Sequence, residues 1–165
     1  MSTYIMSDIH GCYDEFLHML TKINFAATDQ LILAGDYIDR GTKSYEMLKW
    51  IEHKPANVRL IRGNHEEEFA AYVQLMCQLN QQEELSTDFT SAEDTIILYE
   101  TLKYFMKYKG LPIAYFDLYG TLENLLYNYA VTLNDLCKWA DIIRRMPYYI
   151  ELKTADKTYI IVHAG

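Results

Sequence analysis

The sequence has little cysteine, no long apolar run and no excess of positive charge. Its three cysteines, Cys12, Cys77 and Cys137, lack the Cys-x-x-Cys spacing of zinc and redox motifs, which favours reduced thiols in a cytoplasmic protein. No stretch approaches the roughly 20 apolar residues that a membrane helix needs. The first residues lack the basic and apolar segments of a secretory signal. We therefore expect a cytoplasmic protein with no membrane partner.

The charge balance is acidic, with 15 lysines and arginines against 23 aspartates and glutamates and a net charge of −8. A chain of this charge is a poor match for a nucleic-acid backbone, so we expect no nucleic-acid partner. Half of the residues are apolar and 23% are charged, as in a globular protein. With no internal repeat and no linker-like segment, residues 1–165 are predicted to form a single domain.

Strand and helix patterns alternate in the first third of the chain. Short apolar runs predict strands at Thr3–Met6, Gln30–Ala34 and Asn57–Ile61. Apolar residues at helical spacing follow each run, from Tyr13, over Ser44–Glu52 and from Glu66 onward. This order predicts an α/β fold with a largely parallel sheet covered by helices.

The rest of the chain predicts helices and then a hairpin. Asn80–Ser91 is polar and is expected to be a loop. Capping-box pairs, Ser91 with Asp94 and Thr132 with Asp135, predict helices that end near Tyr108 and Arg145. Tyr148–Lys153 and Thr158–Val162 read as a β-hairpin. The expectation from these patterns is a largely parallel sheet, a helical middle segment and a β-hairpin.

Four polar clusters follow the predicted strands directly. Their sequences are Ser-Asp-Ile-His-Gly at 7–11, Gly-Asp-Tyr-Ile-Asp-Arg-Gly at 35–41, Arg-Gly-Asn-His-Glu at 62–66 and His-Ala-Gly at 163–165. In open α/β sheets, loops at the carboxyl ends of strands meet at one edge and bind ligands there. We therefore expect the four clusters to form one site.

The residue types in these clusters suit a centre with two metal ions. Carboxylates, imidazoles and an amide oxygen bind Mn²⁺, Fe and Zn²⁺, and the ligand candidates are Asp8, His10, Asp36, Asn64 and His163. Asp36 could bridge two ions about 3.5–4 Å apart with its two oxygens. Glycines 11, 35, 41 and 63 suit tight turns and close backbone approach.

Taken together, the motifs SDIHG, GDYIDRG, RGNHEE and HAG resemble the phosphoprotein phosphatase branch of the calcineurin-like metallophosphoesterases. They are most similar to those of bacterial and phage serine/threonine protein phosphatases. The match is dense over residues 3–70 and returns over 144–165, whereas the helical middle carries no matching motif. The resemblance implies the calcineurin-like fold, with mixed sheets flanked by helices.

The resemblance also implies a role for each matching residue. Asp8, His10 and Asp36 would bind the first metal ion, and Asp36, Asn64 and His163 the second. The ions would be manganese first of all, with iron or zinc as alternatives. A metal-bridging hydroxide would attack phosphorus directly. His65 would protonate the leaving group, Asp39 would orient His65, and Arg40 together with Asn64 would bind phosphate.

Three functions are compatible with these residues. The resemblance favours hydrolysis of phosphoserine and phosphothreonine in proteins. A symmetrical dinucleoside tetraphosphate, or another small phosphate ester, is an alternative substrate for the same chemistry. The third hypothesis is a metal- or phosphate-binding module without catalysis. Members of the family continue past the His-Ala-Gly motif with a further ligand histidine and a second arginine, so we expect a truncated domain whose second sheet is incomplete.

Some of these residues have simpler explanations. Asp36 and Asp39 could cap the next helix, as aspartates often do. Glu66, Glu67 and Glu68 are expected to do no more than favour a helix N-terminus. Among the remaining polar residues, Arg62 is predicted to be a structural ion-pair partner, and His18 and His53 are predicted to be exposed.

Overall fold

The computed structural model describes residues 1–82, 91–108 and 117–163. The chain divides into two compact units. The first unit combines Met1–Glu67 with Ile143–Gly165, and the second is Glu68–Ile142. Each unit is described by itself below, and every predicted site residue belongs to the first.

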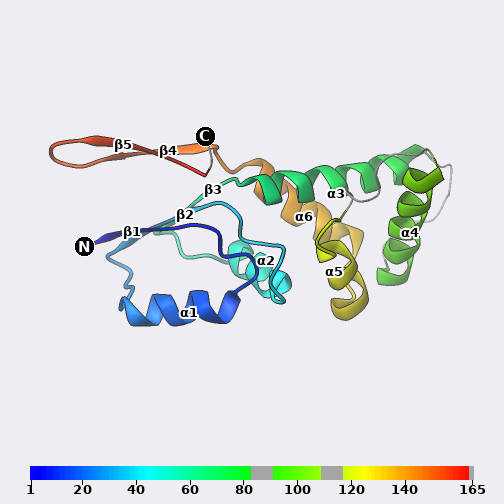
Figure 1. The fold of residues 1–165 in the computed structure, drawn as a ribbon, viewed down its shortest axis with the longest axis horizontal. Coiled ribbons are helices and arrows are strands. Elements are labelled where there is room, and N and C mark those ends of the chain that lie inside the picture. The colour runs from blue at the N-terminus through cyan, green and yellow to red at the C-terminus, as the bar shows by residue number, and fades with distance from the viewer. Residues whose placement is uncertain (83–90, 109–116, 164–165) are drawn as a thin grey trace. The chain divides into compact units, whose positions relative to one another are not determined.

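The first unit is built on a parallel sheet, as predicted (Figure 1). Strands β1 (Thr3–Met6), β2 (Gln30–Ala34) and β3 (Val58–Ile61) are ordered β1-β2-β3 and all run in the same direction. Helices α1 (Tyr13–Lys22) and α2 (Ser44–Glu52) connect them. The three carboxyl ends therefore lie at one edge of the sheet, where the first three polar clusters begin.

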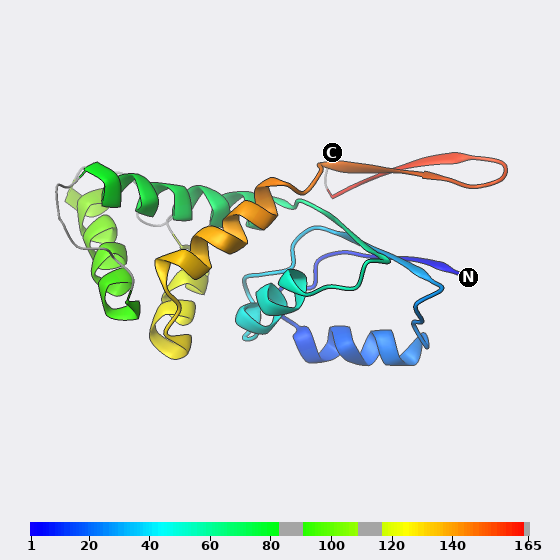
Figure 2. The ribbon, with the colours of Figure 1, turned by 180° about the vertical axis from the view of Figure 1, so that it is seen from behind.

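Alternating side chains of β2 pack on both faces of this sheet. Ile32 and Ala34 join Ile150 in a buried cluster on one face. Leu31 and Leu33 are also fully buried, and strand alternation turns them to the opposite face. Helices α1 and α2 lie on that side in Figures 1 and 2. Burial on both faces explains why the sequence of β2 is an unbroken apolar run.

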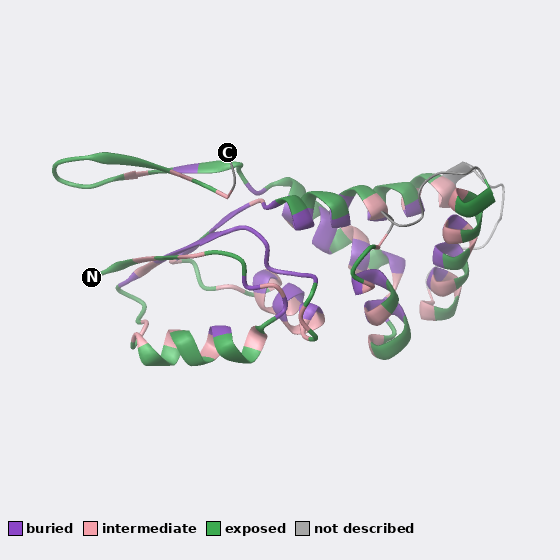
Figure 3. Ribbon diagram, viewed as in Figure 1, coloured by how far each residue is buried: buried purple, intermediate pink, exposed green. Residues whose placement is uncertain are grey.

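A two-stranded antiparallel sheet covers the other face. Strands β4 (Tyr149–Lys153) and β5 (Thr158–Val162) form the predicted hairpin, with Ile150 paired to Ile161. Ile150, Leu152 and Ile161 pack toward β2 and β3, whereas the outward side chains are exposed (Figure 3). The hairpin ends beside the parallel strands and delivers His163 to their edge.

The second unit is helical. It contains most of α3 (Asn64–Gln82), then α4 (Ala92–Tyr108), α5 (Thr121–Tyr129) and α6 (Leu133–Arg144). The two predicted capping boxes are confirmed, since the Ser91 hydroxyl accepts the amide of Asp94 at 3.1 Å and the Thr132 hydroxyl accepts that of Asp135 at 3.2 Å. None of the helices described is long and apolar enough to span a membrane.

Two features of the second unit differ from the expectation. Helix α3 continues to Gln82, so the predicted loop begins later than Asn80, and its residues 83–90 lie outside the described part of the chain. Helix α5 was not predicted. The carboxylate of Asp117 accepts the amides of Leu122 at 2.8 Å and Glu123 at 2.9 Å, which supplies the N-terminal cap that a search for Ser or Thr does not find.

Candidate metal centre

Backbone hydrogen bonds hold the first two polar loops side by side beyond the ends of β1 and β2. The amide of Asp8 donates to the carbonyl of Gly35 at 3.1 Å, and that of His10 to Asp36 at 2.9 Å. The amide of Gly11 then donates to the carbonyl of Tyr37 at 2.8 Å. The pairing of the strands thus extends into the loops, and this fixes Asp8 and His10 beside Asp36.

The backbone of these loops adopts a conformation that is rare outside glycine. Five predicted site residues have positive φ: Asp8 (56°), His10 (47°), Asp36 (55°), Asp39 (70°) and Arg40 (64°). Such residues cost free energy and persist where the surroundings hold them, often at functional sites. Five of these residues cluster in two adjacent loops. The fold therefore accepts a cost in backbone free energy here, and in return the side chains are directed toward the site.

The carboxylate of Asp36 lies at the centre of the site. One oxygen, Oδ2, is 3.6 Å from Nε2 of His10 and 3.7 Å from Nε2 of His65. The other, Oδ1, is 3.2 Å from Nε2 of His163, which comes from the end of β5. Asp36 is buried, and its two oxygens face different imidazoles. This is the arrangement expected of a carboxylate that bridges two cations.

Two of the imidazoles are held with Nε2 toward Asp36. Nδ1 of His10 is 3.1 Å from the carbonyl of Ile38, and Nδ1 of His163 is 2.7 Å from that of Ala34. A carbonyl only accepts, so each Nδ1 carries a proton, and in the neutral form of each ring the lone pair of Nε2 faces the site. A backbone bond of this kind is the usual support of a metal-binding histidine.

The surroundings of His163 test whether a cation suits the site. Its Nε2 faces Oδ1 of Asp36 at 3.2 Å and Oδ1 of Asn64 at 3.1 Å. With Nδ1 donating to a carbonyl, Nε2 can donate to these oxygens only in an imidazolium; in the neutral ring, three lone pairs would face one another. A divalent cation among the three atoms would remove this repulsion, so the donor set fits a metal ion of the nitrogen- and oxygen-preferring kind.

Two groups of side chains could each hold an ion. Asp8, Asp36 and His163 offer ligand atoms within 4.8 Å of one another, and so do His10, Asp36 and His65. Asp36 is common to both groups. Oδ1 of Asp8 also lies 3.9 Å from Nε2 of His10, which keeps the predicted set of Asp8, His10 and Asp36 together.

His65 differs from the other two histidines because an acid, not a carbonyl, holds its Nδ1. That atom is 2.6 Å from Oδ2 of Asp39, and both side chains are buried. Its Nε2 faces Asp36 and lies 3.4 Å from Nη2 of Arg40. The structure therefore joins the three predicted catalytic residues, and Arg40 is the exposed member of the three.

Glu66 is part of the site, contrary to the expectation that it only favours a helix N-terminus. Its carboxylate accepts the amides of Tyr37 at 2.7 Å, Asp36 at 2.8 Å and Gly63 at 3.0 Å. The side chain is fully buried, and burial raises the pKa of Glu66 from 4.5 to about 7. Glu66 thus ties the loop after β2 to the loop after β3 and fixes the backbone of Asp36.

Tyr37 supports the same loop through the hydrogen bonds of its hydroxyl group. Its hydroxyl lies 2.8 Å from the carbonyl of Leu33, close to that of Ile61, and accepts the amides of Gly35 and Ile61. Burial raises the pKa of Tyr37 well above its ordinary value. The ring is fully buried, so the hydroxyl links β2 to β3 at the point where both strands end.

Two glycines are required by close approach. A Cβ on Gly35 would lie 2.7 Å from the ring of His163, and one on Gly63 would lie 2.3 Å from Oδ1 of Asp36. No side chain fits in either place. The glycines predicted for close backbone approach therefore make room for the ligand residues themselves.

Of the simpler explanations for these residues, helix capping by Asp36 and Asp39 is wrong, whereas the structural role of Arg62 is confirmed. Helix α2 has Lys43 as its N-cap with no side-chain cap bond, so neither Asp36 nor Asp39 caps it. Arg62 is a structural partner as predicted, because it pairs with Glu67 at 2.7 Å and binds the carbonyls of Arg144 and Met146. Outside the site, His18 and His53 are exposed as expected, and Cys12 is exposed at the N-cap of α1.

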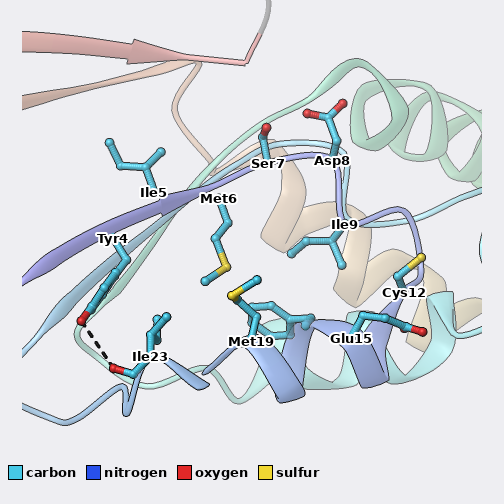
Figure 4. Close-up of a pocket in the computed structure, with 11 residues that line it drawn as sticks. Tyr4, Ile5, Met6, Ser7, Asp8, Ile9, Cys12, Glu15, Met19 and Ile23 are labelled. Carbon is cyan, nitrogen blue, oxygen red and sulfur yellow. Dashed lines mark hydrogen bonds between the residues drawn. The ribbon is translucent and has the colours of Figure 1, made fainter. Parts of the chain in front are cut away.

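An apolar hollow of about 610 Å³ lies between β1 and α1 (Figure 4). Met6, Ile9 and Met19 point into it, whereas Ser7 and Asp8 point away. The hollow is thus separated from the imidazoles by the backbone of the first loop. The charged cluster around Asp36, and not this hollow, is the candidate functional site.

Comparison with known proteins agrees with this geometry. A sequence model of the family described as calcineurin-like phosphoesterase matches residues 1–165. Three curated relatives are named bis(5'-nucleosyl)-tetraphosphatase, symmetrical. The one from Buchnera aphidicola subsp. Baizongia pistaciae is 48% identical over 67 residues, which are 40% of this chain and 24% of the relative. The one from Buchnera aphidicola subsp. Acyrthosiphon pisum is 38% identical over 104 residues, which are 62% of this chain and 38% of the relative. The third, from Vibrio campbellii, is 34% identical over 99 residues, which are 59% of this chain and 37% of the relative.

The matches thus span about a quarter to two fifths of the length of these relatives. A solved structure of a protein serine/threonine phosphatase from Saccharomyces cerevisiae aligns with 90% of this chain and 37% of its own, with a TM-score of 0.47 and 16% identity. A match this remote bears on no question of substrate.

Proposed function

The chain belongs to the calcineurin-like phosphoesterase family, and from this premise we propose that it hydrolyses symmetrical dinucleoside tetraphosphates with two bound divalent metal ions. The calcineurin-like family predicted from the four motifs is confirmed, whereas its phosphoprotein phosphatase branch stays a prediction. The substrate proposed here is the one that the sequence alone offered as an alternative to phosphoproteins.

The observation that carries the proposal is the position of Asp36. Its two oxygens face the Nε2 atoms of His10 and His163 from opposite loops. The site also contains Asp8 and Asp39, so its own charge is negative and would repel a polyphosphate. Cations between these carboxylates would reverse that charge and allow a tetraphosphate to approach. A site with this composition therefore needs its ions to bind its substrate.

The named relatives favour the dinucleotide over the phosphoprotein. All three are symmetrical tetraphosphatases, and they share 34–48% of residues with this chain over the matched segments. The four motifs, by contrast, are compatible with either substrate, since both reactions break a phosphorus–oxygen bond. The preference for phosphoserine and phosphothreonine, which was based on motif resemblance, is therefore withdrawn in favour of the smaller substrate.

In the proposed site, Asp8, His10 and Asp36 would hold one ion, and Asp36, Asn64 and His163 would hold the other. The ions supply Lewis-acid activation of the attacking water and of the phosphoryl oxygens. The chain's own residues do the rest of the chemistry. The guanidinium of Arg40 binds phosphate oxygens with its planar fork, and Asn64 offers an amide to them.

His65 and Asp39 handle the proton. With its Nδ1 bound to Asp39, the His65 ring directs Nε2 toward the reacting phosphate. Water adds its oxygen to one of the two central phosphorus atoms, and the bond from that phosphorus to the central bridging oxygen breaks. His65 donates a proton to the departing oxygen, so that two identical nucleoside diphosphates form. No covalent phosphoenzyme is needed.

The test is a direct comparison of substrates on the 165-residue chain with Mn²⁺, and then with Fe²⁺ and Zn²⁺. We expect metal-dependent conversion of diadenosine tetraphosphate to two ADP, with phosphoserine peptide turned over at least about 10²-fold more slowly. His65→Asn should remove the activity, and the matched variant of an exposed histidine, His18→Asn, should retain it.

Three outcomes would overturn the proposal. Faster turnover of the phosphopeptide than of diadenosine tetraphosphate would favour a protein phosphatase instead. Tight binding of Mn²⁺ without turnover of either substrate would favour a binding module. Equal activity in His65→Asn and His18→Asn would place the chemistry elsewhere.

A further inference from the structure

The second unit brings two cysteines together. The Sγ atoms of Cys77 in α3 and Cys137 in α6 lie 2.8 Å apart, although the residues are 60 positions apart in the sequence. A disulfide bond is about 2.05 Å long, so a small movement of the sulfurs would bring them to bonding distance. No disulfide joins them in this structure, and neither cysteine belongs to the groups of ligand atoms around Asp36.

Packing on both helices holds the two cysteines in place. On α3, Val73 and Met76 are fully buried, and on α6, Leu136 and Ala140 are fully buried. The two helices lie next to each other in Figures 1 and 2, with the sulfur contact between them. Both cysteines are half-buried, so a small oxidant can reach them. The pair is thus preorganised by the fold and remains accessible.

A metal ion is a weaker explanation for the same pair. Zinc sites use at least three protein ligands. Over residues 1–82, 91–108 and 117–163, the groups of three or more ligand atoms that could hold an ion are those around Asp36 and include neither cysteine. Two thiols in contact with each other are suited to oxidation instead.

We propose that Cys77 and Cys137 form a reversible intramolecular disulfide when the protein meets hydrogen peroxide. The thiolate of one cysteine attacks a peroxide oxygen, the oxygen–oxygen bond breaks, and hydroxide leaves a sulfenic acid behind. The second thiolate attacks the sulfur of that sulfenic acid, the sulfur–sulfur bond forms, and a second hydroxide departs. The two thiol protons convert the hydroxides to two waters, so two thiols lose two electrons and peroxide gains them.

The bond would close a ring that contains α4 and α5. The chain passes between its two units after Glu67 and after Ile142, and α3 and α6 are the helices that contain these passages. Joining α3 to α6 therefore closes the helical unit on itself. Because the ring is long, the crosslink removes much conformational freedom from the unfolded chain and stabilises the folded unit.

The test uses Cys12→Ser, which removes the exposed third thiol. Hydrogen peroxide should reduce the number of thiols that react with Ellman's reagent from two to zero in the unfolded protein. Mass spectrometry should show a loss of 2 Da and a peptide containing Cys77 linked to one containing Cys137, on a chain that remains monomeric. Dithiothreitol should restore both thiols. The oxidised protein should melt about 10 °C higher than the reduced one.

Matched variants keep the test decisive. Cys12→Ser/Cys77→Ser leaves one thiol and should show neither the linked peptide nor the rise in melting temperature. Wild-type protein, mapped in the same way, should show the same link without any substitution. The Cys77→Ser/Cys137→Ser variant keeps only Cys12 and shows which dose of peroxide oxidises an exposed thiol. The proposal is overturned if Cys77 and Cys137 both stay reduced at that dose. Conversion of both to sulfinic acids would overturn it too, as would a linked form that melts lower than the reduced one.

Discussion

Nδ1 of His65 lies 2.6 Å from Oδ2 of Asp39; Asp39 lies in the loop after β2, and His65 lies in the first turn of α3, which follows β3. Their side chains are only 3% and 11% exposed, so turning the ring away would break a hydrogen bond between two buried groups. The contact fixes which nitrogen of His65 faces Asp36 and Arg40. A proton donor aimed in this way is of use only if a reacting oxygen arrives at that nitrogen.

Replacing Asp39 with asparagine tests this relationship. Asparagine keeps the size of the side chain but removes its charge, so it no longer balances positive charge on the ring. We expect kcat for diadenosine tetraphosphate to fall by about 10²–10⁴-fold, the usual contribution of a positioned acid. Calorimetric affinity for Mn²⁺ should change little, because Asp39 is not a proposed ligand. A normal kcat would show that His65 works without Asp39.

Replacing Asp36 with asparagine tests the shared ligand. Both candidate groups contain Asp36, so the substitution should weaken binding of both ions together. We expect the affinity for Mn²⁺, measured by titration calorimetry, to fall by more than about 10²-fold. Asp14→Asn is the control, because Asp14 is exposed and pairs with Lys43 at 2.6 Å. If one ion were retained at full affinity in Asp36→Asn, Asp36 would not be the bridge.

Replacing Glu66 with alanine tests the support of the loops. At least three buried amides would lose their acceptor, at about 1–3 kcal/mol each. The free energy of unfolding in urea should therefore fall by more than about 3 kcal/mol. Glu68→Ala changes an exposed residue two positions along the same helix and should stay within about 0.5 kcal/mol of the wild type. Equal effects would mean that the bonds of Glu66 contribute nothing.

The pKa of Glu66 predicts a pH dependence of stability in the metal-free protein. Burial raises this pKa from 4.5 to about 7, so between these values the folded protein keeps a proton that the unfolded chain releases. The contribution of Glu66 is thus most favourable below pH 4.5 and is lost as the pH rises to 7, by about 3 kcal/mol in all. In Glu66→Gln this slope should be absent. Parallel stability curves for the two proteins over pH 4.5–7 would contradict the prediction.

Substitutions at two glycines distinguish the effect of steric crowding from the effect of backbone conformation. Gly63→Ala would place a Cβ 2.3 Å from Oδ1 of Asp36, so it should abolish Mn²⁺ binding in calorimetry and lower the melting temperature. Gly120→Ala meets no atom within 4 Å but has φ of +66°, so it should cost only about 1 kcal/mol and leave metal binding intact. Unchanged metal binding in Gly63→Ala would mean that the loop can yield to the new methyl group.

The parallel strands and the residues of the site could be predicted from sequence because their signals are local. Each strand is a short apolar run, and each polar cluster directly follows a strand. The role of Glu66 was missed because three glutamates stand in a row. Helical spacing does hold a clue, since Glu66 shares a face with Phe69 and Val73, both buried. Only the fold, however, shows that the amides of the loop after β2 lie at that carboxylate.

The tertiary contacts of the helical unit could not be read from the sequence. Helix α5 is capped by Asp117 from outside its first turn, and this cap depends on the path of the chain before the helix. The approach of Cys77 to Cys137 depends on how α3 and α6 pack, which spacing along one helix does not reveal. Local patterns predicted three of the four helices that form this unit, but no contact between them.

The order of the ligands along the chain has a consequence for how the site is made. Asp8, His10 and Asp36 lie in the loops after β1 and β2, and Asn64 begins α3 shortly after β3. His163, by contrast, follows β5, after the whole helical unit. On the ribosome, the parallel strands and their loops would emerge and pair first, at about 5–20 residues per second. A nascent chain could thus capture one ion before His163 has been translated. Supply of metal during synthesis, and not only afterwards, would then govern how much of the protein matures with both ions.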